Sequence, residues 1–158
     1  MLDISVLERK NFKPKEFIYS VTAETEGIDN NIYDIETLVN ASRTMDLAQD
    51  IRNYLDYPII ITSGYRCLKL NRAIGSRDIS QHIKGQAIDF ICPKYGNPEQ
   101  IVKALRNSNI TVDQCLVEND IYGNEWVHVS KKESGKNRNE FAYFLLNKEG
   151  KREKIIMK

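Results

Sequence analysis

The sequence contains very little histidine and cysteine. Of its 158 residues only two are histidines, His82 and His128, and three are cysteines, Cys67, Cys92 and Cys115. An odd number of cysteines without CxxC spacing argues against a disulfide framework and fits synthesis in a reducing compartment. We therefore interpret the cysteines as small, buried apolar residues.

A long apolar run and a charge imbalance are also absent. No stretch approaches the roughly 18 apolar residues of a membrane span, and the charged residues 1–10 do not resemble a secretory signal. The formal net charge of +1 gives no strong field that would recruit nucleic acid or a membrane surface. We expect a monomer that is made in the cytoplasm without a signal peptide and has no nucleic-acid partner.

The order of the expected elements indicates the fold class. Apolar residues recur every three or four positions in 34–55, which predicts a long amphipathic helix, and residues 12–27 also have a helical pattern. Shorter helices are expected at 67–74 and 97–107. Strands are expected at 58–62, 85–92, 113–117 and 126–130, with a hairpin of 140–146 and 154–157. Helices come first and strands mostly later, so we predict a single α+β domain over residues 1–158, with N-terminal helices packed on a small antiparallel sheet.

The two histidines lie in patterns that are typical of zinc ligands. Asp89 belongs to an apolar expected strand, where an aspartate is costly to bury unless it is paired or binds a cation. A sheet can place Asp89 beside His128, and Gly85 allows the preceding loop to bring His82 across. Taken singly, each such residue is more often a satisfied polar core group. Together they supply the three protein ligands of an open, catalytic site, so we predict one Zn²⁺ ion held by His82, Asp89 and His128.

Three segments carry a resemblance to a known family. They are Ser63-Gly64-Tyr65-Arg66, Ser80-Gln81-His82-Ile83-Lys84-Gly85-Gln86-Ala87-Ile88-Asp89 and Trp126-Val127-His128-Val129-Ser130. In this order and spacing they resemble the M15 family of zinc peptidases, which includes D-alanyl-D-alanine carboxypeptidases, dipeptidases and phage L-alanyl-D-glutamate endolysins. The chain looks like a short, single-domain branch of that family. The resemblance implies a fold related to the Hedgehog signalling domain and a zinc peptidase that hydrolyses stem peptides of peptidoglycan.

The resemblance also implies roles for residues around the metal. Arg66 matches the family arginine that polarises the substrate carbonyl or holds a carboxylate, and a guanidinium suits both tasks. Ser80 and Gln81 would line the site and help to fix the substrate, and Trp126 is a further substrate-binding candidate. An alternative role for Ser80 is only to cap the turn.

Two glutamates compete for the role of general base. The resemblance favours Glu125, three residues before His128, as the group that takes a proton from water and passes it to the leaving amine. An ideal strand, however, puts Glu125 on the face opposite His128, so this role requires a bulge or a loop end at residue 125. Glu118 is the rival, because it ends the strand that is expected to pair with 126–130. We favour Glu125 over Glu118.

The sequence leaves the reaction partly open. Carboxypeptidase, endopeptidase and dipeptidase activities share the same metal chemistry, and the cut bond depends on loops. The absence of a signal peptide fits a phage or prophage lysin that reaches the cell wall by another release route. The alternative function is a non-catalytic zinc-containing module that binds cell-wall peptide or a partner protein.

Overall fold

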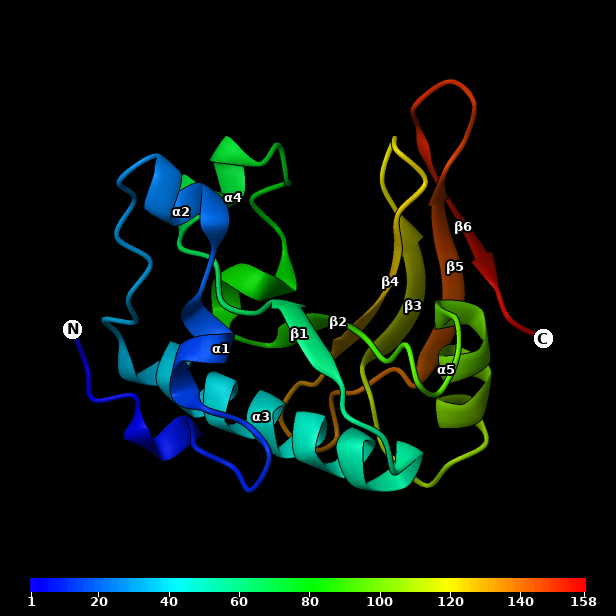
Figure 1. The fold of residues 1–158 in the computed structure, drawn as a ribbon, viewed down its shortest axis with the longest axis horizontal. Coiled ribbons are helices and arrows are strands. Elements are labelled where there is room, and N and C mark those ends of the chain that lie inside the picture. Colours follow the sequence, from blue (N-terminus) through cyan, green and yellow to red (C-terminus); the bar gives the residue numbers. More distant parts are fainter.

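The computed structural model of the protein describes residues 1–158 and contains five α-helices and one six-stranded sheet (Figure 1). The helices are α1 Pro14–Ile18, α2 Val21–Thr25, α3 Ile35–Leu55, α4 Leu68–Ala73 and α5 Pro98–Arg106, with 3₁₀ turns η1 Ser5–Leu7 and η2 Gln81–Lys84. The strands are β1 Ile60–Ser63, β2 Ala87–Ile91, β3 Gln114–Asn119, β4 Glu125–Ser130, β5 Glu140–Leu146 and β6 Arg152–Ile156. The predicted α+β class is confirmed.

The sheet brings distant parts of the chain together. Its strand order is β1-β2-β4-β3-β5-β6, and neighbouring strands are antiparallel except β3 and β5, which are parallel. The sheet is therefore mostly antiparallel, as predicted, and the parallel pair β3–β5 is the exception. The central position of β4, between β2 and β3, is what later brings His128 next to residues of both neighbours.

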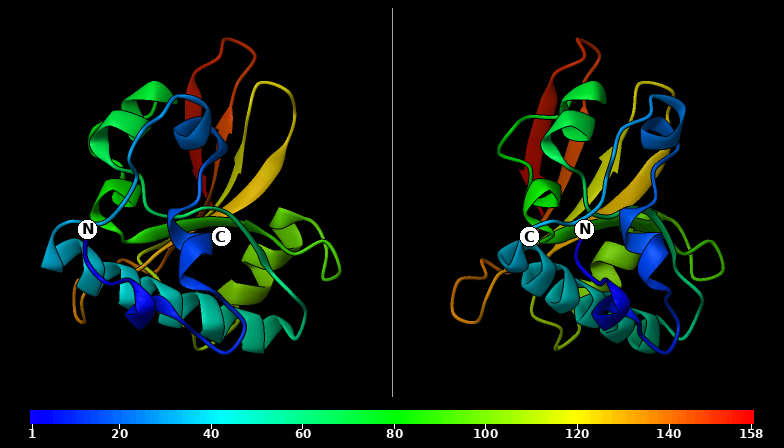
Figure 2. Two further views of the ribbon diagram at one scale, coloured as in Figure 1. Left: turned by 60° about the vertical axis from the view of Figure 1, so that its left-hand side comes forward. Right: turned by 90° about the vertical axis from the view of Figure 1, so that its left-hand side faces the viewer.

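Helix α3 lies along one side of the sheet (Figure 2). Its start is capped by Asp34, whose Oδ1 accepts from the Thr37 amide at 2.7 Å, and it ends at Asp56 in the left-handed conformation. Its buried stripe, including Met45, Ala48 and Ile51, belongs to a core cluster of 23 residues. Apolar positions at helical spacing thus face the sheet, as the periodicity predicts.

The two faces of the sheet have different chemistry. Alternate residues of β2, β3 and β4 join the same core cluster as α3 and α5, and these are Ile88, Phe90, Cys115, Val117, Val127 and Val129. Because side chains alternate along a strand, the residues between them point to the other face. That second face carries Asp89, Glu118, Trp126 and His128. These four side chains therefore lie on the same face of the central strands.

The N-terminal helical region differs from the prediction. Residues 12–27 form two short helices rather than one, because the Ser20 hydroxyl accepts from the Ala23 amide at 3.3 Å and starts a new helix. Tyr19 has an extended backbone between them. In the whole structure, no helix is long and apolar enough to cross a membrane.

Candidate metal centre

Three buried side chains converge at the junction of β2, β4 and η2. Asp89 and His128 are directly paired in the β2–β4 ladder, and His82 reaches them from η2. Asp89 Oδ1 lies 2.9 Å from His128 Nδ1 and 3.2 Å from His82 Nε2, and the two ring nitrogens are 3.3 Å apart. The exposed fractions of the three residues are 2% for His82 and 7% for each of the others. One ligand atom from each residue lies within 4.8 Å of the others, so the group is able to hold a metal ion.

Glycine conformation explains how the loop delivers His82. Gly85 follows η2 with φ +68°, and a Cβ there would lie 2.7 Å from the Thr37 carbonyl oxygen. Both the left-handed backbone and the close approach to α3 require glycine. The Gly85 carbonyl accepts from the Thr44 hydroxyl at 2.8 Å, which attaches the loop to α3. Gly85 therefore turns the chain as predicted from the sequence.

Hydrogen bonds to the outer ring nitrogens orient both imidazoles. His82 Nδ1 lies 2.7 Å from the Gly64 carbonyl oxygen. Because a carbonyl only accepts, Nδ1 is the protonated nitrogen, and Nε2 keeps its lone pair toward Asp89. His128 Nε2 faces the Gln81 Oε1 at 3.4 Å, and its Nδ1 is directed inward to Asp89 and His82. Two imidazole nitrogens and a carboxylate oxygen thus face one point, and this donor set, once deprotonated, fits Zn²⁺.

The charges of the group are strongly coupled. Burial acts to raise the pKa of Asp89, but the adjacent His82 and His128 outweigh it and hold that pKa well below its usual value. Burial lowers the pKa of His82. For His128, burial is outweighed by the hydrogen bond to Asp89 and the charge of Glu118, so its pKa is raised. Asp89 is therefore ionised at neutral pH and available as a ligand.

The structure brings Glu118, and not Glu125, to this group. In the β3–β4 ladder Glu118 is opposite Trp126, two residues from His128 on the same face, and Trp126 Nε1 donates to Glu118 Oε2 at 3.2 Å. Burial raises the pKa of Glu118, with Asp89 adding to the effect and His128 opposing it. Glu125 is exposed and pairs with Asn119 on the other face. The ladder is regular through residue 125, so the bulge that the Glu125 assignment requires is absent.

Arg66 lies beside the group at the end of β1. Its guanidinium interacts electrostatically with Asp89 and Glu118, and its Nε is buried without a hydrogen-bond partner. Asn30 fixes the turn, since its amide donates to the Tyr65 carbonyl at 2.9 Å and its Oδ1 accepts from the Cys67 amide at 2.7 Å. A pocket of about 280 Å³ adjoins Arg66 and is lined by residues that include Tyr19, Thr62 and Ile74.

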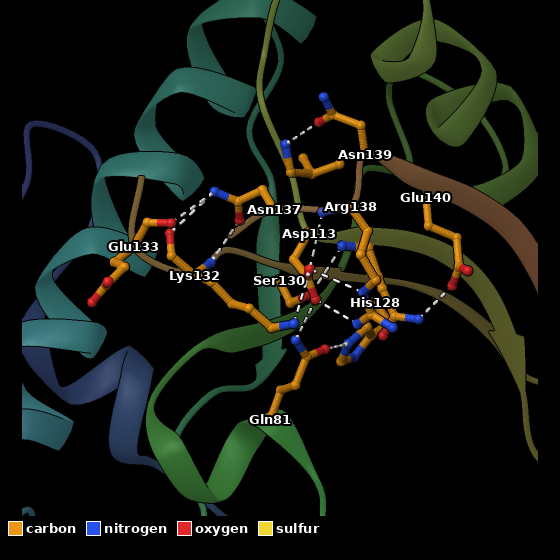
Figure 3. A network of polar contacts seen from close by, with 12 residues as sticks. Gln81, Asp113, His128, Ser130, Lys132, Glu133, Asn137, Arg138, Asn139 and Glu140 are labelled. Atoms are coloured by element: carbon orange, nitrogen blue, oxygen red, sulfur yellow. Dashed lines mark hydrogen bonds and ion pairs between the residues drawn. The ribbon is translucent and has the colours of Figure 1, made fainter. Parts of the chain in front are cut away.

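The remaining candidates have clear positions. Ser80 Oγ accepts from the His82 amide at 3.3 Å, so this hydroxyl caps η2. Gln81 contacts His128 and, through its amide nitrogen, Asp113 Oδ2 at 2.8 Å. Figure 3 shows that Lys132 and Arg138 also reach Asp113. No short motif contains Asp113, Lys132 or Arg138, so the sequence alone does not identify them.

The comparisons with known proteins agree with this geometry. The sequence model described as peptidase M15 matches residues 10–130, which span all three candidate ligands as well as Arg66 and Glu118. A search among curated proteins finds no match. Since the matched region covers most of the 158 residues, the chain belongs to the peptidase M15 family.

Proposed function

We propose that this protein is a zinc peptidase that hydrolyses a peptide bond in the stem peptides of peptidoglycan. The observation that carries the proposal is the convergence of His82, Asp89 and His128, with Glu118 and Arg66 beside them, in a member of the peptidase M15 family. The choice of peptidoglycan rests on the resemblance of the sequence motifs to cell-wall enzymes of that family.

The ligand set suits an open zinc site. His82 Nε2, His128 Nδ1 and an oxygen of Asp89 would hold the ion, and three protein ligands leave a position for water or substrate. Bound zinc supplies Lewis acidity, which polarises a carbonyl and makes water more acidic. The buried setting of the three ligands strengthens these electrostatic effects, because little bulk water screens them.

Glu118 is the general base in this proposal. It shares the sheet face of His128, and its raised pKa places it closer to neutral pH than an ordinary glutamate. Its carboxylate accepts a proton from the attacking water and then gives that proton to the leaving amine. The hydrogen bond from Trp126 Nε1 holds the carboxylate in place, so Trp126 supports the base.

Arg66 binds the substrate. Its buried Nε has no partner within the protein, and its charge is directed toward the same region as Asp89 and Glu118. The guanidinium would donate to the scissile carbonyl or to a substrate carboxylate, where negative charge develops during attack. The adjoining pocket beside Tyr19 and Thr62 accommodates a neighbouring part of the peptide.

The test is a digest of purified muropeptides with zinc-loaded protein, followed by mass spectrometry of the products. Cleavage of one stem-peptide bond supports the proposal and also identifies the bond. If metal analysis shows full zinc loading and no stem peptide is cut, the peptidoglycan proposal is refuted.

A His82→Ala variant separates catalysis from a non-catalytic zinc module. A variant that stays folded but cleaves nothing indicates a catalytic ion. A variant that unfolds indicates that the metal is structural and supports the alternative of a binding module. Circular dichroism and the same digest provide the two measurements.

A further inference from the structure

We propose that Arg152, held over the ring of Phe144, forms a second anion-binding position on the sheet face of the candidate metal ligands, where it binds a free carboxylate of the substrate peptide. Arg66 follows β1 and Arg152 lies on β6, so the two cations approach Glu118 from opposite edges of the sheet. The inference rests on the proposed function in taking a peptide as the ligand. It adds a recognition element from strands that follow the matched residues 10–130.

The strand register puts Phe144 beside Glu118 on this face. Glu118 is paired with Phe144 in the parallel β3–β5 ladder and with Trp126 in the β3–β4 ladder, and paired residues of neighbouring strands project from the same face. Tyr143 and Leu145, which alternate with Phe144, pack against the core on the other face. Trp126, Glu118 and Phe144 therefore form one row across three strands. All three are half-buried, so the row is partly open to solvent.

Two contacts with Phe144 hold Arg152 at the end of this row. In the β5–β6 ladder Arg152 is paired with Leu146, so its side chain is on the same face and lies diagonally across from Phe144. Its guanidinium carbon is 5.4 Å from the centre of the Phe144 ring, a cation–π contact, and its Nη1 donates to the Phe144 carbonyl at 2.9 Å. From there its charge acts on Glu118. The hairpins β3–β4 and β5–β6 that carry the row rise side by side (Figure 1).

The charge of Arg152 has no carboxylate partner in the protein. Lys154, the other cation of β6 on this face, is paired, because its ammonium lies 3.1 Å from both carboxylate oxygens of Glu140. Arg152 forms no such ion pair, and its side chain is exposed. Because Nη1 donates to the Phe144 carbonyl, Nε and Nη2 remain as two adjacent donors. Two such donors match the two oxygens of a carboxylate, so the ligand of this position is an anionic group.

The strand spacing gives the distance between the bound carboxylate and the cleaved bond. His128 is on β4 and Phe144 is two strands away on β5, which corresponds to about 10 Å across the sheet. An extended peptide spans about 3.3–3.6 Å per residue, so the carboxylate lies about three residues from the cleaved bond. In the stem peptide L-Ala-γ-D-Glu-L-Lys-D-Ala-D-Ala, the glutamate with its free α-carboxylate is the third residue before the terminal bond.

The experiment compares two synthetic peptides that differ in one group. One is L-Ala-γ-D-Glu-L-Lys-D-Ala-D-Ala with a free glutamate α-carboxylate, and in the other this carboxylate is amidated. Binding is measured with zinc-loaded Glu118→Gln protein from the fluorescence of Trp126, the only tryptophan of the chain, which is paired with position 118. This background slows cleavage. It also removes the Glu118 carboxylate, so an influence of Arg152 that acts only through that group disappears.

We expect Arg152→Gln in this background to raise the Kd of the free-carboxylate peptide about three- to tenfold, the range for one exposed but bidentate ion pair, and to leave the Kd of the amidated peptide within about twofold. The matched control is Lys154→Gln, which removes the same charge from the same strand and face, but from a side chain that Glu140 already pairs. Its Kd values should stay within about twofold for both peptides. Both positions are exposed, and circular dichroism checks that the variants are folded.

Three results would overturn the anion-binding position. One is a change in Arg152→Gln that is the same for both peptides, including no change at all. The second is an equal effect of Lys154→Gln, which indicates a general effect of charge. The third is that neither peptide binds the Glu118→Gln protein.

The titration does not require cleavage, so the two proposals fail separately. If the muropeptide digest gives no product, the proposed function is refuted, but a preference for the free carboxylate that depends on Arg152 still supports the anion-binding position. If the peptides are cleaved without such a preference, the anion-binding position alone is refuted.

Discussion

Replacing Glu118 by glutamine tests the assignment of the general base most directly. Glutamine keeps the size of the side chain and an oxygen that accepts from Trp126 Nε1, now 3.2 Å from the carboxylate. It removes the ability to accept a proton from water. A positioned general base contributes about 10²–10⁴-fold to the rate, which corresponds to about 3–5 kcal/mol of activation free energy. We expect kcat of Glu118→Gln to fall by that factor on the muropeptide that the protein cleaves.

The pH dependence provides a second measurement on the same variant. A base must be deprotonated to act, so the rate falls as pH drops through its pKa. Since burial raises the pKa of Glu118, the acid limb of the wild-type profile should lie above the pKa of an ordinary glutamate. That limb should disappear in Glu118→Gln.

The matched control is Glu125→Gln, which makes the same chemical change at the exposed start of β4. Its kcat should stay within about twofold of the wild-type value, as a surface change away from the site has little effect. Zinc content is measured for both variants, so that loss of metal is not mistaken for loss of the base. The opposite pattern, an active Glu118→Gln and an inactive Glu125→Gln, would refute the reasoning from strand register.

Three other predictions concern stability. Zinc at a thousand times its Kd should stabilise the fold by about 4 kcal/mol, seen as a rise in Tm that a chelator reverses; no rise would argue against the site. Gly64→Ala should cost at least about 2 kcal/mol in urea unfolding, since its Cβ would lie 2.2 Å from the Phe17 carbonyl oxygen. The buried Asp113 should contribute about 2 kcal/mol at neutral pH, because its hydrogen bonds and ion pairs outweigh burial and hold its pKa at about 2, below the unfolded value of 3.8. That stability is present above pH 3.8 and is lost as pH falls through about 2, so acid titration of Asp113→Asn should show a shallower decline.

Local signals in the sequence predict local structure well. The start of α5 follows from Asn97, Pro98 and Gln100, and the structure has the expected capping box with both hydrogen bonds at 2.9 Å. The stripe of α3 follows from its 3.6-residue period. The break at Ser20 does not follow from the pattern, because a serine caps a new helix only where its own backbone is extended, as it is here, and the sequence does not specify that conformation.

Long-range pairing was predicted less completely. The alternation in 87–91 and 126–130 indicates two buried strands, and their pairing places Asp89 opposite His128 as expected. The parallel pairing of β3 with β5 has no counterpart in the sequence pattern, because alternation specifies which face a residue occupies but not which strand lies beside it. For this reason the sequence pattern predicts the antiparallel sheet but not its one parallel pair.

The two candidate bases, Glu118 and Glu125, illustrate why candidate metal ligands are easier to identify in a sequence than the groups around them. Metal ligands must have particular side chains, so the candidates His82, Asp89 and His128 stand out in short motifs. A base needs only a carboxylate at the right place, and its place is set by register with a different strand. The regular β3–β4 ladder puts Glu118 two residues from His128 on one face and Glu125 on the other. For the same reason, the contact between Asp113 and Arg138 cannot be predicted from a short motif, because it joins residues 25 positions apart. Strand register, rather than motif spacing, therefore has to be measured before roles next to a metal are assigned.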